Sequence, residues 1–236
     1  MNLPPQYDGG EKFNAQANQA VTLFFLSRSD RLVPAEYRAS FAHLYMDIAW
    51  FGVLSGSAMA FVAVYAARQG ASARQLGLLT AGPAMVNLMF ALPAGRWLEK
   101  RSIAPAVFWV AVLHRVFYLL WVPLPFLLAP HGQIWVLIGL TLIMGIPGVA
   151  LAIGFNALFA DTVPPEWRGR VAGGRNGLLA VTFVVTSLLC GYILSHFPFP
   201  LGYHFVFGIG FLGAAMSCLH LRFVRPPAGV APPRVG

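Results

Sequence analysis

Charged side chains are scarce in this chain of 236 residues: they account for 10% of it, while hydrophobic residues account for 58%. Ordinary soluble domains carry about 25% charged residues. A soluble domain of this size must expose much of its surface to water, and a disordered chain needs low hydrophobicity. The scarcity of charge therefore excludes both classes.

Cysteine is also scarce, because only Cys190 and Cys218 are present and both lie within apolar runs. Their positions exclude a disulfide scaffold and give no metal-ligand spacing. The sequence has no His-Glu-x-x-His zinc motif, no Gly-Lys-Ser/Thr phosphate loop and no Gly-x-Ser-Gly turn of an intramembrane serine protease. We therefore expect no enzyme activity, no catalytic residues, no metal site and no cofactor.

Six long apolar runs are present instead, and a membrane span needs about 20 such residues. We expect spans at about 41–66, 75–95, 104–129, 133–160, 177–197 and 202–224. The spans must be helices, because a chain in lipid has to satisfy its own backbone hydrogen bonds and the runs are too long for barrel strands. The prediction is an all-α membrane protein with a six-helix domain over 41–224. A polar segment, 1–40, precedes it and a Pro-rich tail, 225–236, follows it.

The basic residues are unevenly distributed between the two sides that six spans define. Thirteen of the 16 fall on the side of the two termini, whereas Arg68 and Arg74 fall on the other side and Arg115 lies within a span. Positive charge accumulates on the cytoplasmic side of membrane proteins. We therefore expect both termini in the cytoplasm and the protein in the cell (inner) membrane. Because the basic residues stand in short clusters between apolar runs, we interpret them as topology signals and not as a surface that binds nucleic acid. The expected partner is the lipid bilayer.

Two segments on the predicted cytoplasmic side resemble sequences of the major facilitator superfamily. The first is similar to the signature between the family's second and third spans, and it reads Gly95-Arg96-Trp97-Leu98-Glu99-Lys100-Arg101-Ser102. Glu99 stands where the family usually has Asp. The segment from Asp161 to Arg170, continuing to Asn176, is similar to the one between its fourth and fifth spans. The resemblance covers about residues 38–225.

The resemblance implies a fold like one half of a twelve-span transporter, with both termini inside. It also implies a secondary transporter that moves a small solute by alternating access, here as a half-length unit. The partner would be a second six-span half, either a homodimer copy or another membrane chain. The alternative is a non-transporting membrane subunit or assembly factor that packs against other membrane proteins.

The same resemblance implies candidate gating residues in the two cytoplasmic loops. These are Gly95, Glu99, Lys100, Arg101, Asp161, Glu166, Arg168 and Arg170. Lys100 and Arg101 also fit a simpler role in holding the topology, and both interpretations stay open.

Polar side chains inside the predicted spans are the candidates for substrate binding or ion coupling, because ionisable groups are costly in lipid. At 1.5 Å per helical residue, Arg115 lies about 16 Å into its span and Asp47 about 9 Å into its own, from the same side. A long arginine side chain can bridge that difference, so we expect a pair. It is either a structural ion pair or part of a substrate or proton site. His43, His114 and Asn87 complete the candidate set.

Overall fold

The computed structural model describes residues 35–225, and no strand occurs among them. Six helices are long and apolar enough to cross a membrane. The first is built from α2 (Ala35–Leu54), the short π-helix η1 (Ser55–Met59) and α3 (Ala60–Arg68), and the others are α4 (Ala73–Glu99), α5 (Ile103–Trp121), α7 (Pro130–Thr162), α8 (Pro165–His196) and α9 (Leu201–Leu221). The prediction of an all-α protein with six spans is confirmed. The predicted terminal segments fall mostly outside the described residues.

Two helices differ in extent from the predicted spans, and proline marks the difference in both. The predicted fifth span starts at 177, whereas α8 already begins at Pro165, because proline suits the first helical position, where no backbone donor is needed. The predicted third span reaches 129, whereas α5 ends at Trp121. Pro123 and Pro125 follow it, and only the single turn α6 (Leu124–Leu127) forms there, since proline removes helical hydrogen bonds.

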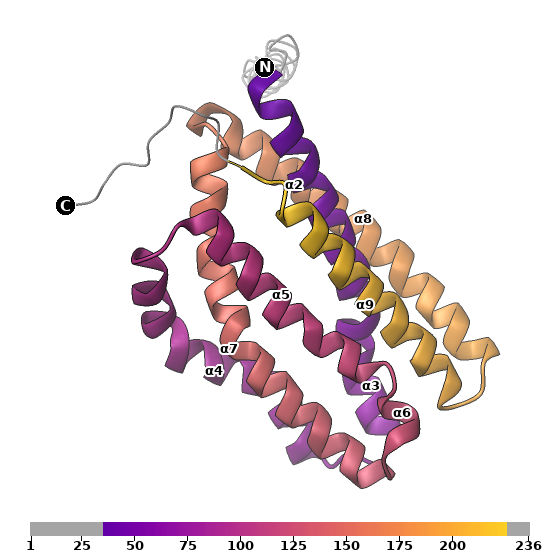
Figure 1. Ribbon diagram of the computed structural model, residues 1–236. Helices are drawn as coiled ribbons and strands as arrows, with labels where there is room; N and C mark the ends of the chain where they lie inside the picture. Colours follow the sequence, from indigo (N-terminus) through magenta and orange to yellow (C-terminus); the bar gives the residue numbers. More distant parts are fainter. Residues whose placement is uncertain (1–34, 226–236) are drawn as a thin grey trace, which may run out of the picture. The chain divides into compact units, whose positions relative to one another are not determined.

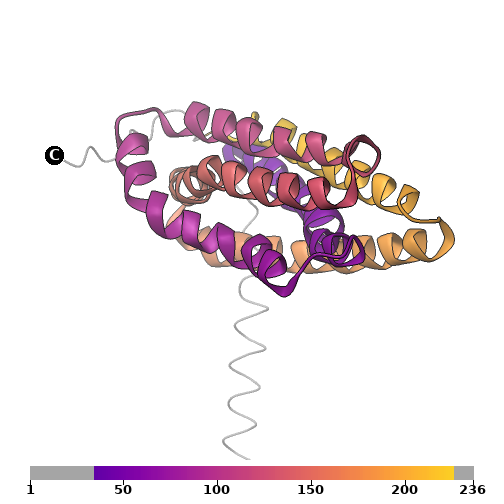
Figure 2. The same ribbon diagram turned by 90° about the horizontal axis from the view of Figure 1, so that it is seen from below.

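The six helices are arranged in a bundle with two opposite sides. In Figure 2, α4 and α8 run along one side, α5 and α9 run along the other, and the first span and α7 lie between them. Helix α7 packs against both α4 and α5, while η1 packs against both α8 and α9 (Figure 1). The first span and α7 are therefore the two central elements, and polar side chains on them can face the interior.

Glycines allow the first span to approach α8 closely. A Cβ atom on Gly52 would overlap the side chain of Thr182, and one on Gly56 would lie 2.5 Å from the carbonyl oxygen of Phe183. Small residues permit such contacts between membrane helices. This small-residue face is therefore used within the bundle and is covered by α8.

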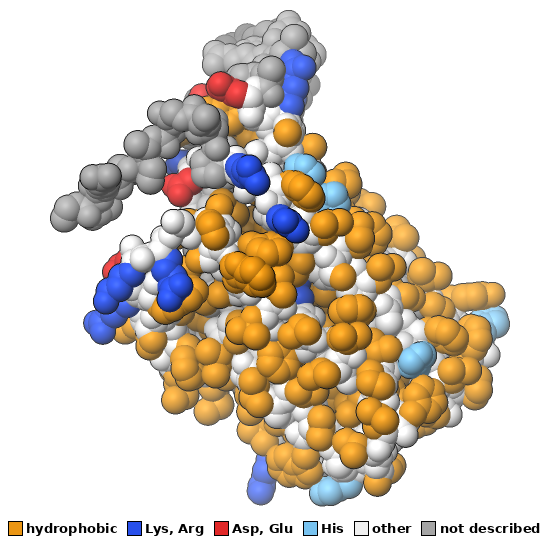
Figure 3. All heavy atoms as spheres, in the orientation of Figure 1, with side chains coloured by type: hydrophobic (Ala, Val, Ile, Leu, Met, Phe, Trp, Pro, Cys, Tyr) orange, Lys and Arg blue, Asp and Glu red, His pale blue; other side chains and the backbone are white. Residues whose placement is uncertain are grey.

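The two helices on one side of the bundle bury little of their apolar surface. Within the apolar 18-residue stretch that defines each span, 11% of the residues are buried in α4 and 11% in α8. The share is 33–44% in the other four spans. Met85, Leu88, Met89 and Leu92 share one face of α4, and Leu88 is 85% exposed. Hydrophobic side chains also cover most of the face in Figure 3. Only lipid or another apolar surface can cover so much, so this is a multi-pass membrane protein.

Both described ends of the chain lie at the same end of the bundle. The hydroxyl of Ser40, near the start of α2, donates a hydrogen bond of 2.9 Å to the carbonyl oxygen of Arg225, after α9. Most charged side chains visible in Figure 3 gather at this end. The arrangement places both ends on one side of a membrane, and the identity of that side stays a prediction.

Candidate functional site

A cavity of about 620 Å³ lies in the bundle, and each of the six spans contributes to its wall. Pockets for small organic molecules usually have about 300–1,000 Å³. Most of the wall is apolar, and the polar residues in it are Asp47, Asn87, His114, Arg115, Asn156, Arg175 and Asn176. Gly148 of α7 makes room for one of them, because a Cβ atom there would lie 3.0 Å from His114 Nδ1.

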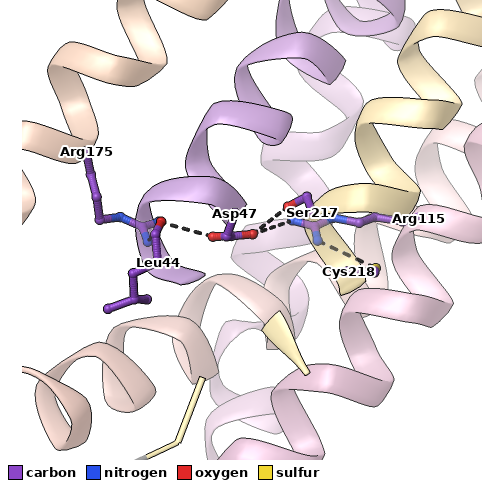
Figure 4. A network of polar contacts seen from close by, with 6 residues as sticks. All are labelled: Leu44, Asp47, Arg115, Arg175, Ser217 and Cys218. Atoms are coloured by element: carbon purple, nitrogen blue, oxygen red, sulfur yellow. Dashed lines mark hydrogen bonds and ion pairs between the residues drawn. The ribbon is translucent and has the colours of Figure 1, made fainter. Parts of the chain in front are cut away.

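Asp47 of α2 lies at the centre of a charged cluster, which consists of Asp47, Arg115, Arg175 and Ser217. Its Oδ1 accepts a hydrogen bond of 2.5 Å from the hydroxyl of Ser217 on α9. The other oxygen, Oδ2, accepts one of 3.3 Å from Arg175 Nη2 on α8. Figure 4 shows the carboxylate between the two arginines. All four side chains are less than 10% exposed, so the cluster joins helices by charges held away from water.

Arg115 of α5 reaches the same carboxylate, with Nη2 at 3.8 Å from Asp47 Oδ1. The two side chains therefore approach each other as the depth estimate predicts, although their role in transport stays a prediction. The remaining contacts of Arg115 are weak. Its Nη1 lies 3.5 Å from the sulfur of Cys218, and its buried Nε has no hydrogen-bond partner in the described part of the chain. One donor of this guanidinium is thus unused.

Arg175 is a charged member of this cluster that sequence reasoning missed, as it missed Ser217. The sequence interpretation counted it among the 13 basic residues of the cytoplasmic side, whereas it lies in α8, 7% exposed, and contacts Asp47. It also donates a hydrogen bond of 2.7 Å to the carbonyl oxygen of Leu44. The error follows from the late predicted start of the span. Counted from Pro165, Arg175 lies about 15 Å into its helix, which would have placed it beside the other intramembrane charges.

Of the remaining candidates inside the predicted spans, His114 and Asn87 line the cavity and His43 does not. His114 lines the cavity and its Nδ1 lies 2.8 Å from the carbonyl oxygen of Met144, so that nitrogen carries the proton. Asn87 lines the cavity from α4. His43, one helical turn before Asp47, is outside the cavity wall. Its Nδ1 lies 3.1 Å from that of His220 at the charged end of the bundle.

The gating candidates belong mainly to helices, so their assignment to two loops is wrong. The linkers at this end of the described chain are short. Only 100–102 separate α4 from α5, and only 163–164 separate α7 from α8. Gly95 and Glu99 are in α4, Asp161 is in α7, and Glu166, Arg168 and Arg170 are in the first turns of α8, whereas Lys100 and Arg101 follow α4. None of them lines the cavity.

Two of these gating candidates make local contacts that stabilise helix ends. Arg168 donates hydrogen bonds to the carbonyl oxygens of Ala160 and Val163, at 2.8 and 3.0 Å. These carbonyls lie at the end of α7, where helical partners are missing. The guanidinium of Arg101 lies over the ring of Trp97, 4.6 Å from its centre. A gating role for the set stays a prediction.

Comparison with known proteins identifies the family to which the chain belongs. No curated protein and no solved structure matches it. The family model described as Major Facilitator Superfamily matches residues 41–236, which include all six spans from the second turn of α2 onward. The predicted resemblance to this family is thereby confirmed. Proteins of this family are transporters, and the chain belongs to the Major Facilitator Superfamily.

Proposed function

We propose that this protein moves a small solute across the cell (inner) membrane by alternating access, with the cavity as its solute site. The observation that carries the proposal is the position of the charged cluster in the wall of a cavity that all six spans line. Buried charges are costly in a membrane and usually face a partner or a water-filled path. Membership of the family supports transport as the general activity, and the cavity is a suitable place for the solute to bind.

A purely structural ion pair is the competing interpretation of the cluster. Such a pair stabilises a bundle only when its polar atoms are satisfied. Arg175 meets this condition through Asp47 and the carbonyl of Leu44. Arg115 does not, because its Nε has no partner in the described structure. The contrast supports a structural role for Arg175 and a solute role for Arg115.

Alternating access also needs a second body against which these helices move. Secondary transporters commonly alternate access by moving two related bundles against each other around the site. We propose a second six-span half as partner, either a homodimer copy or another membrane chain. The exposed apolar side formed by α4 and α8 supports this, since it leaves much surface to be covered. The positive-inside rule supports cytoplasmic placement of the charged end.

Reconstitution into proteoliposomes tests the proposal. A panel of labelled small solutes is offered to the wild-type chain and to Ala152→Phe, in which a bulky ring fills the cavity without altering its charges. The matched control is Ala215→Phe, an exposed position on α9 outside the cavity wall. We expect uptake by wild type and control and at least tenfold slower uptake by Ala152→Phe. Equal uptake by all three variants would contradict the proposed site.

A further inference from the structure

The cavity wall carries an excess of positive charge. Its charged side chains, within the described part of the chain, are the carboxylate of Asp47 and the guanidinium groups of Arg115 and Arg175. Two cations and one anion leave one positive charge without a counter-charge. All three groups are less than 10% exposed, so the excess lies away from bulk water. A buried charge of this kind is costly unless an anion accompanies it.

The excess is concentrated on Arg115, because the stronger contacts of Asp47 go elsewhere. Arg175 at 3.3 Å and Ser217 at 2.5 Å each engage one carboxylate oxygen. Arg115 reaches that carboxylate only at 3.8 Å, and a cysteine sulfur is a weak acceptor. Its Nε remains a buried donor without a partner. A guanidinium that is held by weak contacts and keeps one unsatisfied donor suits a carboxylate, which accepts charge-assisted hydrogen bonds.

The rest of the wall defines the body of such an anion. Aromatic rings of Phe51, Phe155 and Phe159 line the cavity, and the guanidinium carbon of Arg115 lies 6.0 Å from the centre of the Phe51 ring. The other polar groups in the wall are uncharged amides and an imidazole. A ligand with one negative charge and an apolar body therefore fits, whereas a dianion would reverse the local charge.

We infer that the cavity binds a small organic monoanion, a carboxylate with an apolar body, and that the carboxylate contacts Arg115. The inference rests on the proposed function in that the cavity is taken as the solute site. It adds the chemical class of the solute and the residue that recognises it.

Direct binding to the purified full chain in mild detergent tests the inference without transport. Phenylacetate and octanoate are compared with phenylacetamide and octanamide, which have the same bodies without the charge. We expect the wild-type chain to bind at least one carboxylate about tenfold or more tightly than its amide, because a charge-assisted hydrogen bond is roughly twice as strong as a neutral one. Absence of this preference in both pairs overturns the inference.

Variants of Arg115 identify the recognising residue. Arg115→Gln should lower carboxylate affinity to that of the amide, and Arg115→Lys should retain part of the preference because it keeps the charge. Arg74→Gln, an exposed cation at the far end of the bundle, is the matched control and should bind as wild type does. Unchanged carboxylate binding by folded Arg115→Gln overturns the inference. Where that variant does not fold, the wild-type carboxylate-to-amide ratio decides.

Proteoliposome uptake separates failure of the inference from failure of the proposed function. Carboxylate binding that depends on Arg115, without uptake of any solute, supports the anion site and contradicts transport. Uptake of uncharged or cationic solutes that is equal in wild type and Arg115→Gln supports transport and overturns the anion site.

Discussion

Two polar clusters connect the helices of this bundle, and they differ in charge and in how completely their atoms are satisfied. The charged cluster around Asp47 leaves Arg115 Nε without a partner among the described residues. The second, which we term the neutral cluster, consists of Tyr65, Gln69 and Gln133. It lies about 27 Å further along the first span, at 1.5 Å per residue.

The neutral cluster forms a closed set of hydrogen bonds. The hydroxyl of Tyr65 donates to Gln133 Oε1, and the amide of Gln69 donates to both of these oxygens. The amide nitrogen of Gln133 donates to the carbonyl oxygen of Leu128 at 2.6 Å. A satisfied neutral network fixes helices relative to one another. The comparison separates two kinds of polar cluster: one whose atoms are satisfied and which fixes helices, and one with a charge left short of partners at a cavity, on which the proposed solute site rests.

The largest expected effect is loss of the carboxylate at the centre of the charged cluster. Asp47→Asn leaves two buried arginines facing each other, which we expect to cost about 3–5 kcal/mol of unfolding free energy. Thermal unfolding in detergent measures the loss. The triple variant Asp47→Asn, Arg115→Gln, Arg175→Gln should recover much of it, since no charge remains. A triple variant that loses the sum of the single losses would show that the three charges are not coupled.

The two arginines should respond differently, which sharpens the assignment within the cluster. Arg175→Gln removes the closest counter-charge of Asp47 and the hydrogen bond to Leu44, and should cost about 3 kcal/mol. Arg115→Gln removes a weakly partnered cation and leaves Asp47 paired with Arg175, so it should cost clearly less than Arg175→Gln. Parallel thermal unfolding of the two variants is the measurement. Equal losses would contradict the division between a structural and a solute-facing arginine.

Disruption of the neutral cluster should lower the stability of the bundle without changing binding at the proposed solute site. Gln133→Leu leaves the hydroxyl of Tyr65 and the carbonyl of Leu128 without their amide partner and should cost about 1–3 kcal/mol. Because the cluster is remote from the cavity, the carboxylate-to-amide preference should be that of wild type. Unfolding temperature and phenylacetate binding are measured on the same preparation. A loss of binding in the folded variant would break the comparison between the two clusters.

The smallest effect on stability is expected from labelling variants that locate the two clusters relative to the membrane. Ser102→Cys and Arg74→Cys are exposed and lie at opposite ends of the bundle, while the native Cys190 and Cys218 are buried. An impermeant thiol reagent added outside cells should label Arg74→Cys and leave Ser102→Cys unlabelled. The reverse pattern would place the charged end outside and contradict the positive-inside assignment.

The amino-acid sequence by itself determined the helices and the family. Hydropathy and length are local properties, so they defined six spans, and the two segments at the charged end gave the resemblance that the family comparison confirms. Helical rise also related Asp47 to Arg115, because depth in a membrane helix depends only on counting residues.

Only the tertiary structure decided which polar groups meet and where a cavity remains. Arg175 and Ser217 join Asp47 from α8 and α9, more than a hundred residues away along the chain. Polar residues at the start of α8 lowered its hydropathy and hid the start of that helix. The small-residue face of Gly52 and Gly56 meets Thr182 and α8 rather than another chain. These contacts depend on how helices distant in sequence pack side by side, and no local pattern encodes that packing.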